Sequence, residues 1–465
     1  MPKSRNERKR PPPEAVTVGV DVDVDDLAHD GRGVAHLHGK AVFIDGALPA
    51  EEVRFHYTAR HSQYDEGELE AVISPSPERV EPRCGHFGVC GGCSLQQLAA
   101  EAQLRYKQQW LLDNLRRIGR VEPEEWLEPL RGPVWGYRHK ARLGVKHVPK
   151  KGKVLVGFRE RSSSLLADLQ RCEVLHPRIG GLLQQLGALV DRLSLRDRLP
   201  QIEVAVGDDT AALSFRVLAP PSPEDKALLC DFGQRHELYI YLQSGGPETT
   251  ALLWPENAAP LSYRLPEFGL ELAFMPYHFV QINAAINRRM VQQAVELLDA
   301  RADERILDLF CGLGNFTLAL ARQSREVVGV EGDRELVAWA QRNAAGNGSA
   351  NAHFYAADLT QDASRRHWAQ EPYDKVLLDP PRTGALAVLP LIAAVQARRV
   401  VYVSCHPATL ARDAGELVHR FGYRLLRAGI MDMFPHTTHL ESIALFERPR
   451  ERRQPGDVLE LPRQR

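Results

Sequence analysis

The last third of the chain contains four short apolar segments separated by stretches with helical periodicity. The segments cover residues 306–310, 327–331, 376–379 and 400–404, and an apolar helix over 284–298 precedes them. Parallel strands need long crossover connections, so this alternation predicts a parallel, doubly wound α/β sheet. Open sheets of this kind bind ligands at the carboxyl ends of their strands. The residues that end or follow these segments are therefore the first candidates for a site.

The upstream sequence has a different organisation, and 465 residues are long for one core. Short alternating segments over 16–20, 39–44 and 53–57, separated by glycines, predict a small β-barrel. A helix is expected over 96–118, and residues 125–275 read as mostly strand with one helix near 177–193. The predicted parts are a basic tail over 1–13, a β-barrel over 14–75, a central α+β domain over 76–283, the α/β domain over 284–448 and a tail over 449–465.

The net charge of −1 conceals an uneven distribution. Residues 14–74 hold thirteen acids against four Lys or Arg, whereas residues 131–161 hold ten Lys or Arg and one acid. Trp135, Tyr137 and Phe158 lie among these cations, which suits a nucleic-acid backbone and stacked bases. A solvated basic hairpin face is the alternative.

Two absences bear on location. No apolar run is long enough to span a membrane, and the basic N-terminus is not followed by the apolar segment of a signal peptide. We therefore expect a cytoplasmic protein without a membrane partner, whose thiols stay reduced.

Cys405 lies in Ser404-Cys405-His406-Pro407, directly after the segment 400–404. The neighbouring segment ends in Asp379-Pro380-Pro381-Arg382. A thiol at a strand end beside a carboxylate suits covalent nucleophilic catalysis. The alternative is a cysteine that only fills space in the core.

A glycine loop follows the first segment of the α/β domain. Asp308 through Gly314 gives the pattern D-x3-G-x-G between a strand and a helix, and Thr317 stands where a dinucleotide loop has a third glycine. This favours S-adenosylmethionine over NAD. Glu331 is placed to accept the ribose hydroxyls, and Asp358 to meet the adenine amino group. The alternative for each acid is a helix cap or a solvated loop residue.

Three cysteines form C-x5-C-x2-C in a glycine-rich loop, at Cys84, Cys90 and Cys93. Cys172 is the best fourth thiolate, because Cys230 falls in an expected helix. Four thiolates suit a [4Fe-4S] cluster or tetrahedral zinc, and the spacing, unlike that of paired C-x2-C zinc ribbons, favours iron–sulfur. Unliganded thiols are the remaining alternative.

Taken together, the motifs resemble those of the bacterial RNA (uracil-5-)-methyltransferases, in particular the iron–sulfur enzymes that modify uracil 1939 of 23S ribosomal RNA. The resemblance covers nearly the whole chain. It rests on the four cysteines and on segments 31–35, 137–142, 279–283, 308–312, 379–382, 404–407 and 439–442. It implies a Rossmann-like class I methyltransferase domain, a TRAM-like (OB-like) N-terminal barrel and a central domain with the iron–sulfur loop.

The resemblance also implies roles for individual residues. Cys405 would be the nucleophile and Glu441, in His439-Leu440-Glu441-Ser442, the base. The implied S-adenosylmethionine contacts are Gln281, Phe310, Asn315, Glu331, Asp358 and Asp379, and the implied cluster ligands are Cys84, Cys90, Cys93 and Cys172. The expected partner is 23S ribosomal RNA, bound by a monomer. The chain departs from the family pattern at Pro49-Ala50-Glu51, where Pro-Gly-Glu is usual, and at His406, where Asn is common.

These residue types fit the chemistry of uracil methylation. C5 of uracil is a poor nucleophile until a thiolate adds at C6, and a base must later remove the C5 proton. Two alternatives are an amino-group methyltransferase, suggested by the Asp-Pro-Pro sequence, and a non-catalytic RNA-binding protein with a structural metal. Neither would need a thiol at the strand end.

Overall fold

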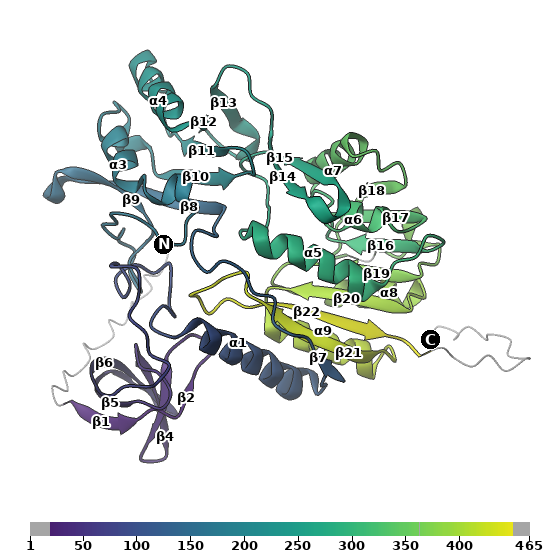
Figure 1. Ribbon diagram of the computed structural model, residues 1–465, viewed down its shortest axis with the longest axis horizontal. Coiled ribbons are helices and arrows are strands. Elements are labelled where there is room, and N and C mark those ends of the chain that lie inside the picture. Colours follow the sequence, from purple (N-terminus) through teal and green to yellow (C-terminus); the bar gives the residue numbers. More distant parts are fainter. Residues whose placement is uncertain (1–18, 362, 450–465) are drawn as a thin grey trace, which may run out of the picture. The chain divides into compact units, whose positions relative to one another are not determined.

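The computed structural model describes residues 19–361 and 363–449 (Figure 1). The predicted tail over 1–13 lies outside the described residues, as does the tail over 449–465 from residue 450 on. The chain divides into two compact units. The first contains the chain up to Lys107, with Arg159–Ala167 and Pro435–Thr438; the second contains Gln108–Phe158, Asp168–Phe434 and the chain from His439 on.

The first unit is built on a six-stranded sheet with the order β1-β5-β6-β4-β3-β2. Its strands are β1 (Val20–Asp23), β2 (Asp26–Leu27), β3 (Gly33–Leu37), β4 (Lys40–Asp45), β5 (Glu52–Arg60) and β6 (Tyr64–Ser74). Alternate side chains, among them Val42, Ile44 and Phe55, form its buried core. Of the strands predicted here, those over 39–44 and 53–57 are confirmed. The strand predicted over 16–20 overlaps β1 only at Val20, and residues 16–18 lie outside the described range.

The helix predicted over 96–118 is confirmed as α1 (Ala100–Asn114), which continues as a π-helical turn over Leu115–Gly119. The second unit begins within α1 and contains two large sheets. The first has the order β13-β12-β11-β10-β8-β9. Its strands are β8 (Lys140–Val148), β9 (Lys153–Gly157), β10 (Gln201–Val206), β11 (Ala211–Arg216), β12 (Leu238–Gln243) and β13 (Thr250–Trp254).

The region 125–275 contains more than the one helix predicted near 177–193, and the helix expected at Cys230 is confirmed. Besides α2 (Pro177–Gly180) and α3 (Leu183–Asp191), a long helix α4 (Pro223–His236) connects β11 to β12. The two strands are parallel neighbours, which requires a crossover of this kind. Ser222 and Asp225 form a capping box at its start, a signal that the sequence carried.

The predicted α/β fold is confirmed by the eight-stranded sheet β18-β17-β16-β19-β20-β22-β21-β7. Its strands are β7 (Glu125–Trp126), β16 (Arg305–Leu309), β17 (Glu326–Glu331), β18 (Ala352–Ala356), β19 (Lys375–Leu378), β20 (Arg399–Ser404), β21 (Arg424–Met431) and β22 (Glu441–Glu447). The four apolar segments became β16, β17, β19 and β20, and all pairs among β16–β20 are parallel. β22 lies between β20 and β21 and runs antiparallel to both, so the sheet is mixed at this end.

Helices surround this sheet (Figure 1). They are α5 (Ala284–Leu298), α6 (Thr317–Ala321), α7 (Arg334–Gly346), α8 (Leu389–Ala394) and α9 (Pro407–His419). From β16, the strands β17 and β18 follow on one side of the sheet, and β19 and β20 follow on the other. Right-handed crossovers therefore put α6 and α7 on one face and α8 and α9 on the other.

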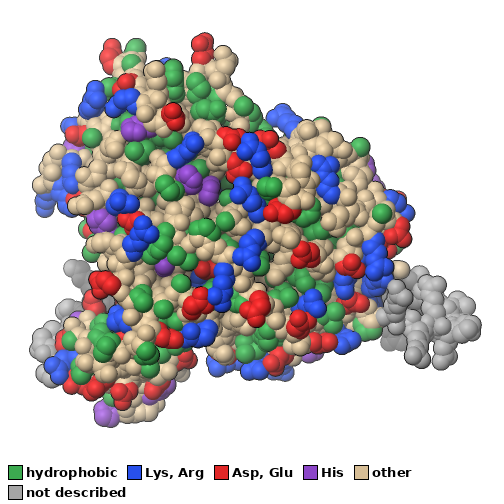
Figure 2. All heavy atoms as spheres, viewed as in Figure 1, with side chains coloured by type: hydrophobic (Ala, Val, Ile, Leu, Met, Phe, Trp, Pro, Cys, Tyr) green, Lys and Arg blue, Asp and Glu red, His purple; other side chains and the backbone are tan. Residues whose placement is uncertain are grey.

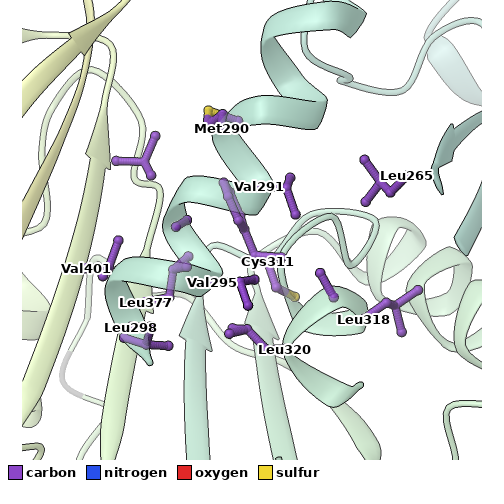
Figure 3. Close-up of a cluster of buried hydrophobic side chains, with 14 of the residues drawn as sticks. Leu265, Met290, Val291, Val295, Leu298, Cys311, Leu318, Leu320, Leu377 and Val401 are labelled. Carbon is purple, nitrogen blue, oxygen red and sulfur yellow. The ribbon is translucent and has the colours of Figure 1, made fainter. Parts of the chain in front are cut away.

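The core of the sheet domain lies under α5. Met290, Val291 and Val295 on one face of this helix point toward the strands and the loop after β16 (Figure 3). Cys311 lies within this cluster and is 3% exposed. This packing fixes the loop that the sequence assigned to the cofactor. Within residues 19–361 and 363–449, no helix combines the length and the apolar character needed to cross a membrane.

Candidate active site

The inserted antiparallel strand β22 determines what faces Cys405. Because β22 begins where β20 ends, Ser442 pairs with Ser404 in the register. Glu441, the first residue of β22, is thereby brought to the edge where Cys405 follows β20. The side chain of Ser442 reinforces this junction by donating to the Ser404 carbonyl at 3.0 Å. Two segments far apart in the sequence thus meet at one strand edge.

The thiol of Cys405 lies in an acidic setting and is half-buried. Burial, together with the Glu441 and Asp379 carboxyls, raises its pKa to about 11 against the opposing effect of the Arg382 guanidinium. The thiol is therefore protonated at neutral pH in the free protein, and its activation requires a proton acceptor. The two facing carboxyls are the acceptors at this edge.

Both carboxyls hold protons tightly. Glu441 is 2% exposed, and burial raises its pKa well above the usual range, with a contribution from Asp379 that Arg382 opposes. Burial also raises the pKa of Asp379 to about 7. Gln281 Nε2 donates to Asp379 Oδ2 at 3.4 Å. A carboxyl with a raised pKa is a strong proton acceptor once ionised, which suits general-base chemistry.

Arg382 is the cation of this site, and it was not among the site residues predicted from the sequence. Its guanidinium Nη2 lies 3.2 Å from His439 Nδ1, and Thr409 Oγ1 donates to its carbonyl at 3.2 Å. The signal was present in the sequence, because Arg382 follows the Pro380-Pro381 pair and His439 precedes Glu441 by two residues. The guanidinium lowers the pKa of both Cys405 and Glu441.

The loop after β16 reverses direction sharply. Phe310 has a positive φ of 65°, which is unusual for a residue with a side chain, and its N–H donates to the Val330 carbonyl at 2.8 Å. Gly312 adopts a φ of 52° and Gly314 one of 91°. This local strain directs the loop toward the carboxyl end of β17.

Glu331, at the end of β17, has its carboxylate fixed by two backbone donors. Gly312 N–H donates to Oε2 at 3.1 Å, and Asp333 N–H donates to Oε1 at 3.0 Å. Each carboxylate oxygen keeps lone pairs beyond these bonds, so the group can still accept from hydroxyls. Asp358, after β18, is exposed, and both the N–H and the hydroxyl of Thr360 donate to its Oδ1. These two hydrogen bonds lower the pKa of Asp358.

Asp308 is a buried acid whose environment the sequence did not predict. Its side chain is fully buried, Thr317 Oγ1 donates to Oδ2 at 2.5 Å, and Oδ1 has no hydrogen-bond partner within the described part of the chain. Burial raises its pKa to about 7. Asp308 therefore adds a further carboxyl near Asp379 and Glu331, both of which raise its pKa electrostatically.

The structure distributes the four predicted cluster thiols between the two units. Cys84, Cys90 and Cys93 lie in the first unit, whereas Cys172 lies in the second. All four are half-buried and free of disulfides. Within residues 19–361 and 363–449, no three His, Cys, Asp or Glu side chains are grouped so that they could hold a metal ion.

The three-cysteine loop is nevertheless ordered by backbone pairing. Gly91 N–H donates to the Arg159 carbonyl at 2.9 Å, and Arg161 N–H donates to the Val89 carbonyl at 2.8 Å. Gly92 N–H reaches Cys90 Sγ at 3.4 Å. Burial raises the pKa of Cys90, and the nearby Cys84 raises it further.

The basic segment over 131–161 forms the hairpin β8–β9 and its flanks, but much of its charge is committed. Arg142 pairs with Glu203 at 2.9 Å, and Lys151 and Lys153 pair with Asp168 at 3.0 and 2.9 Å. Blue and red side chains are intermixed over the face seen in Figure 2. Lys140 also differs from the exposed cation expected in this basic segment. It donates to the Pro276 carbonyl, and burial lowers its pKa to about 8.

Comparisons with known proteins identify the family of this chain. A family model described as tRNA (Uracil-5-)-methyltransferase matches residues 270–449. A Nitrosococcus oceani protein named 23S rRNA (uracil(1939)-C(5))-methyltransferase RlmD is 56% identical over 432 residues, covering 92% of this chain and 96% of the relative. The chain belongs to the RlmD family.

A second RlmD relative, from Methylococcus capsulatus, is 53% identical over 444 residues, covering 96% of this chain and 99% of the relative. Membership of the RlmD family makes the protein a methyltransferase. This sets aside the non-catalytic alternative.

A solved structure shares the fold of this RlmD-family chain. The crystal structure of Pyrococcus abyssi tRNA (uracil-54, C5)-methyltransferase in complex with S-adenosyl-L-homocysteine has a TM-score of 0.69 and 23% identity, and the match covers 92% of this chain and 99% of that one.

Proposed function

We propose that this protein transfers a methyl group from S-adenosylmethionine to C5 of a uridine in 23S ribosomal RNA, at the position equivalent to uracil 1939, through a covalent bond between Cys405 and C6 of the uracil. The observation that carries the proposal is the half-buried thiol at the end of β20, facing the buried carboxyl at the start of β22. An amino-group methyltransferase would need no such thiol. The names of the RlmD relatives supply the RNA and the position.

The residues around the glycine loop fit S-adenosylmethionine. Glu331 presents a carboxylate held in one orientation by Gly312 and Asp333, and such a group can accept from ribose hydroxyls. Asn315, Phe310 and Asp358 lie on the adjoining loops, and Gln281 is bonded to Asp379. When bound, S-adenosylmethionine would supply an electrophilic methyl group.

The chain's own residues account for the remaining steps. Cys405 loses its proton to a facing carboxyl and its sulfur adds to C6, so the ring electrons move toward C5 and O4. C5 would then take the methyl group, while the bond between that methyl and the sulfonium sulfur breaks and S-adenosylhomocysteine remains. Glu441 takes the C5 proton, the C5–C6 double bond re-forms and the C6–S bond breaks, which returns the thiolate. The target base must leave the RNA stack to reach this edge.

The upstream parts would hold the RNA. We assign residues 14–75 to a TRAM-like barrel, residues 76–283 to an RNA-binding central domain and residues 284–448 to methyl transfer, in a cytoplasmic monomer. The six-stranded sheet β1–β6 and the basic hairpin β8–β9 support this assignment. Because Arg142, Lys151 and Lys153 pair with acidic side chains, the contribution of the hairpin to RNA binding would come mainly from its other basic residues.

A [4Fe-4S] cluster on Cys84, Cys90, Cys93 and Cys172 is part of the proposal. The donor chemistry fits, because three thiols share one loop and a backbone N–H already reaches Cys90 Sγ. Among the described residues no group of three possible ligands is arranged to hold a metal ion, so the cluster rests on the donor chemistry alone. Protein purified without oxygen should contain iron and sulfide and absorb broadly in the visible range; stoichiometric zinc without iron would contradict the cluster.

Transfer of a labelled methyl group tests the central claim. Wild-type protein should label 23S ribosomal RNA from a strain that lacks the modification, and mapping should place the label on a single uridine as 5-methyluridine. RNA with 5-fluorouridine at that position should form a covalent complex with the protein, because fluorine cannot be removed as a proton is. Label on an exocyclic amine, or no covalent complex with RNA that binds, would contradict the proposal.

A further inference from the structure

The hairpin β14 (Leu261–Leu265) and β15 (Leu270–Phe274) lies against α7 and the glycine loop of the α/β domain. Asn343, on α7, accepts from Ala273 N–H at 2.9 Å and donates to the carbonyl of Leu313 in the glycine loop at 3.2 Å. Asn347 accepts from Glu271 N–H at 2.9 Å and donates to its carbonyl at 2.7 Å. Amide side chains therefore connect this hairpin to the helix and loop that follow β16 and β17.

One member of this network is Asn315, which the proposed function places against S-adenosylmethionine. Tyr263 Oη, from β14, donates to Asn315 Oδ1 at 3.0 Å. Asn287, from α5, donates to the same oxygen at 3.1 Å, and Asn315 Nδ2 donates back to Asn287 Oδ1 at 2.9 Å. Asn287 is 4% exposed, so its amide has little access to water as an alternative partner.

These three hydrogen bonds leave the Asn315 amide with one orientation. The carbonyl oxygen accepts two bonds, and one of the two N–H groups is committed to Asn287. The second N–H of Asn315 has no hydrogen-bond partner among the described residues, so it is available to donate to a ligand. If the Asn315 amide turned over, its N–H groups would face the N–H groups of Asn287 Nδ2. Two donors would then oppose each other, so the hydrogen bonds with Asn287 disfavour this orientation.

The same two residues also border a small cavity beside the catalytic edge. Tyr263 and Asn287 line it together with Gln281, which bonds to Asp379. Tyr263 packs against Phe274 at a ring-centroid distance of 6.0 Å, so its hydroxyl is held by the hairpin. The hairpin thereby reaches both the glycine loop and the neighbourhood of Asp379.

We propose that Tyr263 and Asn287 are positioning residues that act through Asn315 to set the affinity for S-adenosylmethionine. This inference rests on the proposed function, and it adds two residues outside the glycine loop to the cofactor site. They act on the ground-state complex and touch no reacting atom. Their loss should therefore raise KM for the cofactor and change kcat little.

The experiment compares Tyr263→Phe and Asn287→Ala with the wild type in the full-length protein. S-Adenosylhomocysteine binding is measured by calorimetry, KM and kcat by methyl transfer to 23S ribosomal RNA, and Tm by thermal unfolding. We expect Kd and KM to rise about 5- to 20-fold in each variant, with kcat within about twofold, since each loses a hydrogen bond to Asn315. The double variant should lose less than the product of the two effects, because both residues bind the same oxygen.

Tyr239→Phe is the matched control, since Tyr239 packs against the same apolar cluster as Tyr263. It should leave Kd and KM unchanged. Asn287→Asp keeps the acceptor for Asn315 Nδ2 but replaces the donor with an oxygen that faces Asn315 Oδ1, so it should recover none of the affinity lost in Asn287→Ala. Unchanged Kd and KM in both Tyr263→Phe and Asn287→Ala would overturn the inference. It would also be overturned if kcat fell by the same factor as affinity and Tm fell as well, because that result would indicate a general structural defect. A wild type that fails to bind S-adenosylhomocysteine would instead overturn the proposed function.

Discussion

Two cysteines follow strands of the same eight-stranded sheet, and their surroundings differ in burial and in charge. Cys311 comes just after β16, is 3% exposed and packs among the side chains of α5 and α6 (Figure 3). Cys405 follows β20, is half-buried and faces carboxyls and a guanidinium. Burial raises the pKa of both thiols, to about 11 for Cys405 and well above the usual range for Cys311. A raised pKa alone therefore does not mark a nucleophile.

The backbone explains the difference. The positive φ of Phe310 turns the chain after β16, and the N–H groups of Phe310 and Cys311 both bind the Val330 carbonyl. The turn leaves the Cys311 thiol against the core, where a Cβ on Gly329 would lie 3.0 Å from its sulfur. After β20 the chain enters α9 directly, so Cys405 stays at the strand edge. What makes Cys405 a candidate is access together with adjacent proton acceptors.

The largest expected effect comes from removing each thiol in turn. Cys405→Ala should abolish methyl transfer to 23S ribosomal RNA and the covalent complex with 5-fluorouridine RNA. Cys311→Ala should keep measurable activity and lose about 1 kcal/mol of stability from the small cavity created. Labelled methyl incorporation and thermal unfolding measure the two effects. Equal loss of activity in both variants would remove the distinction between the two sites.

Glu441→Gln should separate bond formation from elimination. Without the base, the thiolate adds and C5 is methylated, but the C5 proton stays and the C6–S bond persists. Turnover should fall by about 10²–10⁴-fold, as is typical when a general base is lost. A covalent protein–RNA species should then appear on a denaturing gel with unmodified RNA. Wild-type turnover without that species would assign the proton to another group.

Alkylation tests the acidic setting of Cys405 directly. Removing the negative charge in Asp379→Asn should lower the thiol pKa, because the Asp379 carboxylate raises it. Between about pH 7, above which the Asp379 carboxyl is ionised, and pH 11, the thiolate fraction should then increase, by tenfold for each unit that the pKa of Cys405 falls. Mass spectrometry of the Cys405 peptide after iodoacetamide treatment at several pH values measures this rate.

Asp303→Asn, at an exposed position outside the site, is the control and should not change the rate of Cys405 alkylation. Cys311 should stay unmodified throughout. A slower reaction in Asp379→Asn would show that the carboxyl acts as the proton acceptor more than as a repelling charge.

The smallest effect concerns the residue that follows the nucleophile. His406 caps α9, since its Nδ1 accepts from Thr409 N–H at 3.3 Å. His406→Ala should cost about 1 kcal/mol of stability, the usual cost of losing a helix cap. His406→Asn should retain the cap, because Asn is a preferred capping residue. Urea unfolding measures both, and equal stability of the two variants would exclude a capping role.

Local patterns predicted the strand ends of the α/β domain well. The runs of Val, Ile and Leu in β16, β17, β19 and β20 are bounded by polar residues, and the sheet follows from that alternation. The same patterns placed Cys405, Asp379 and Glu331 at strand ends. The pairing of Glu441 with this edge depends on the antiparallel insertion of β22, and the sequence analysis reached it through the family resemblance.

Long-range burial was harder to predict. In the sequence, Lys140 is one of ten cations in a basic segment. In the structure it donates to the carbonyl of Pro276, a residue more than a hundred positions away in the chain. The hydrogen bonds of Tyr263 and Asn287 to Asn315 have the same origin, because no periodicity connects β14, α5 and the glycine loop.

The strand β7 has a consequence for how the protein is made. Glu125 and Trp126 pair in parallel with Arg427 and Ala428 of β21, so the outer edge of the catalytic sheet is supplied from the first third of the chain. During synthesis this segment leaves the ribosome long before β21 and must wait for its partner. Such non-local pairing slows folding and exposes an unpaired strand meanwhile. A chain interrupted before Arg427 would lack the residues that pair with β7, so the backbone groups of Glu125 and Trp126 would remain without their strand partner.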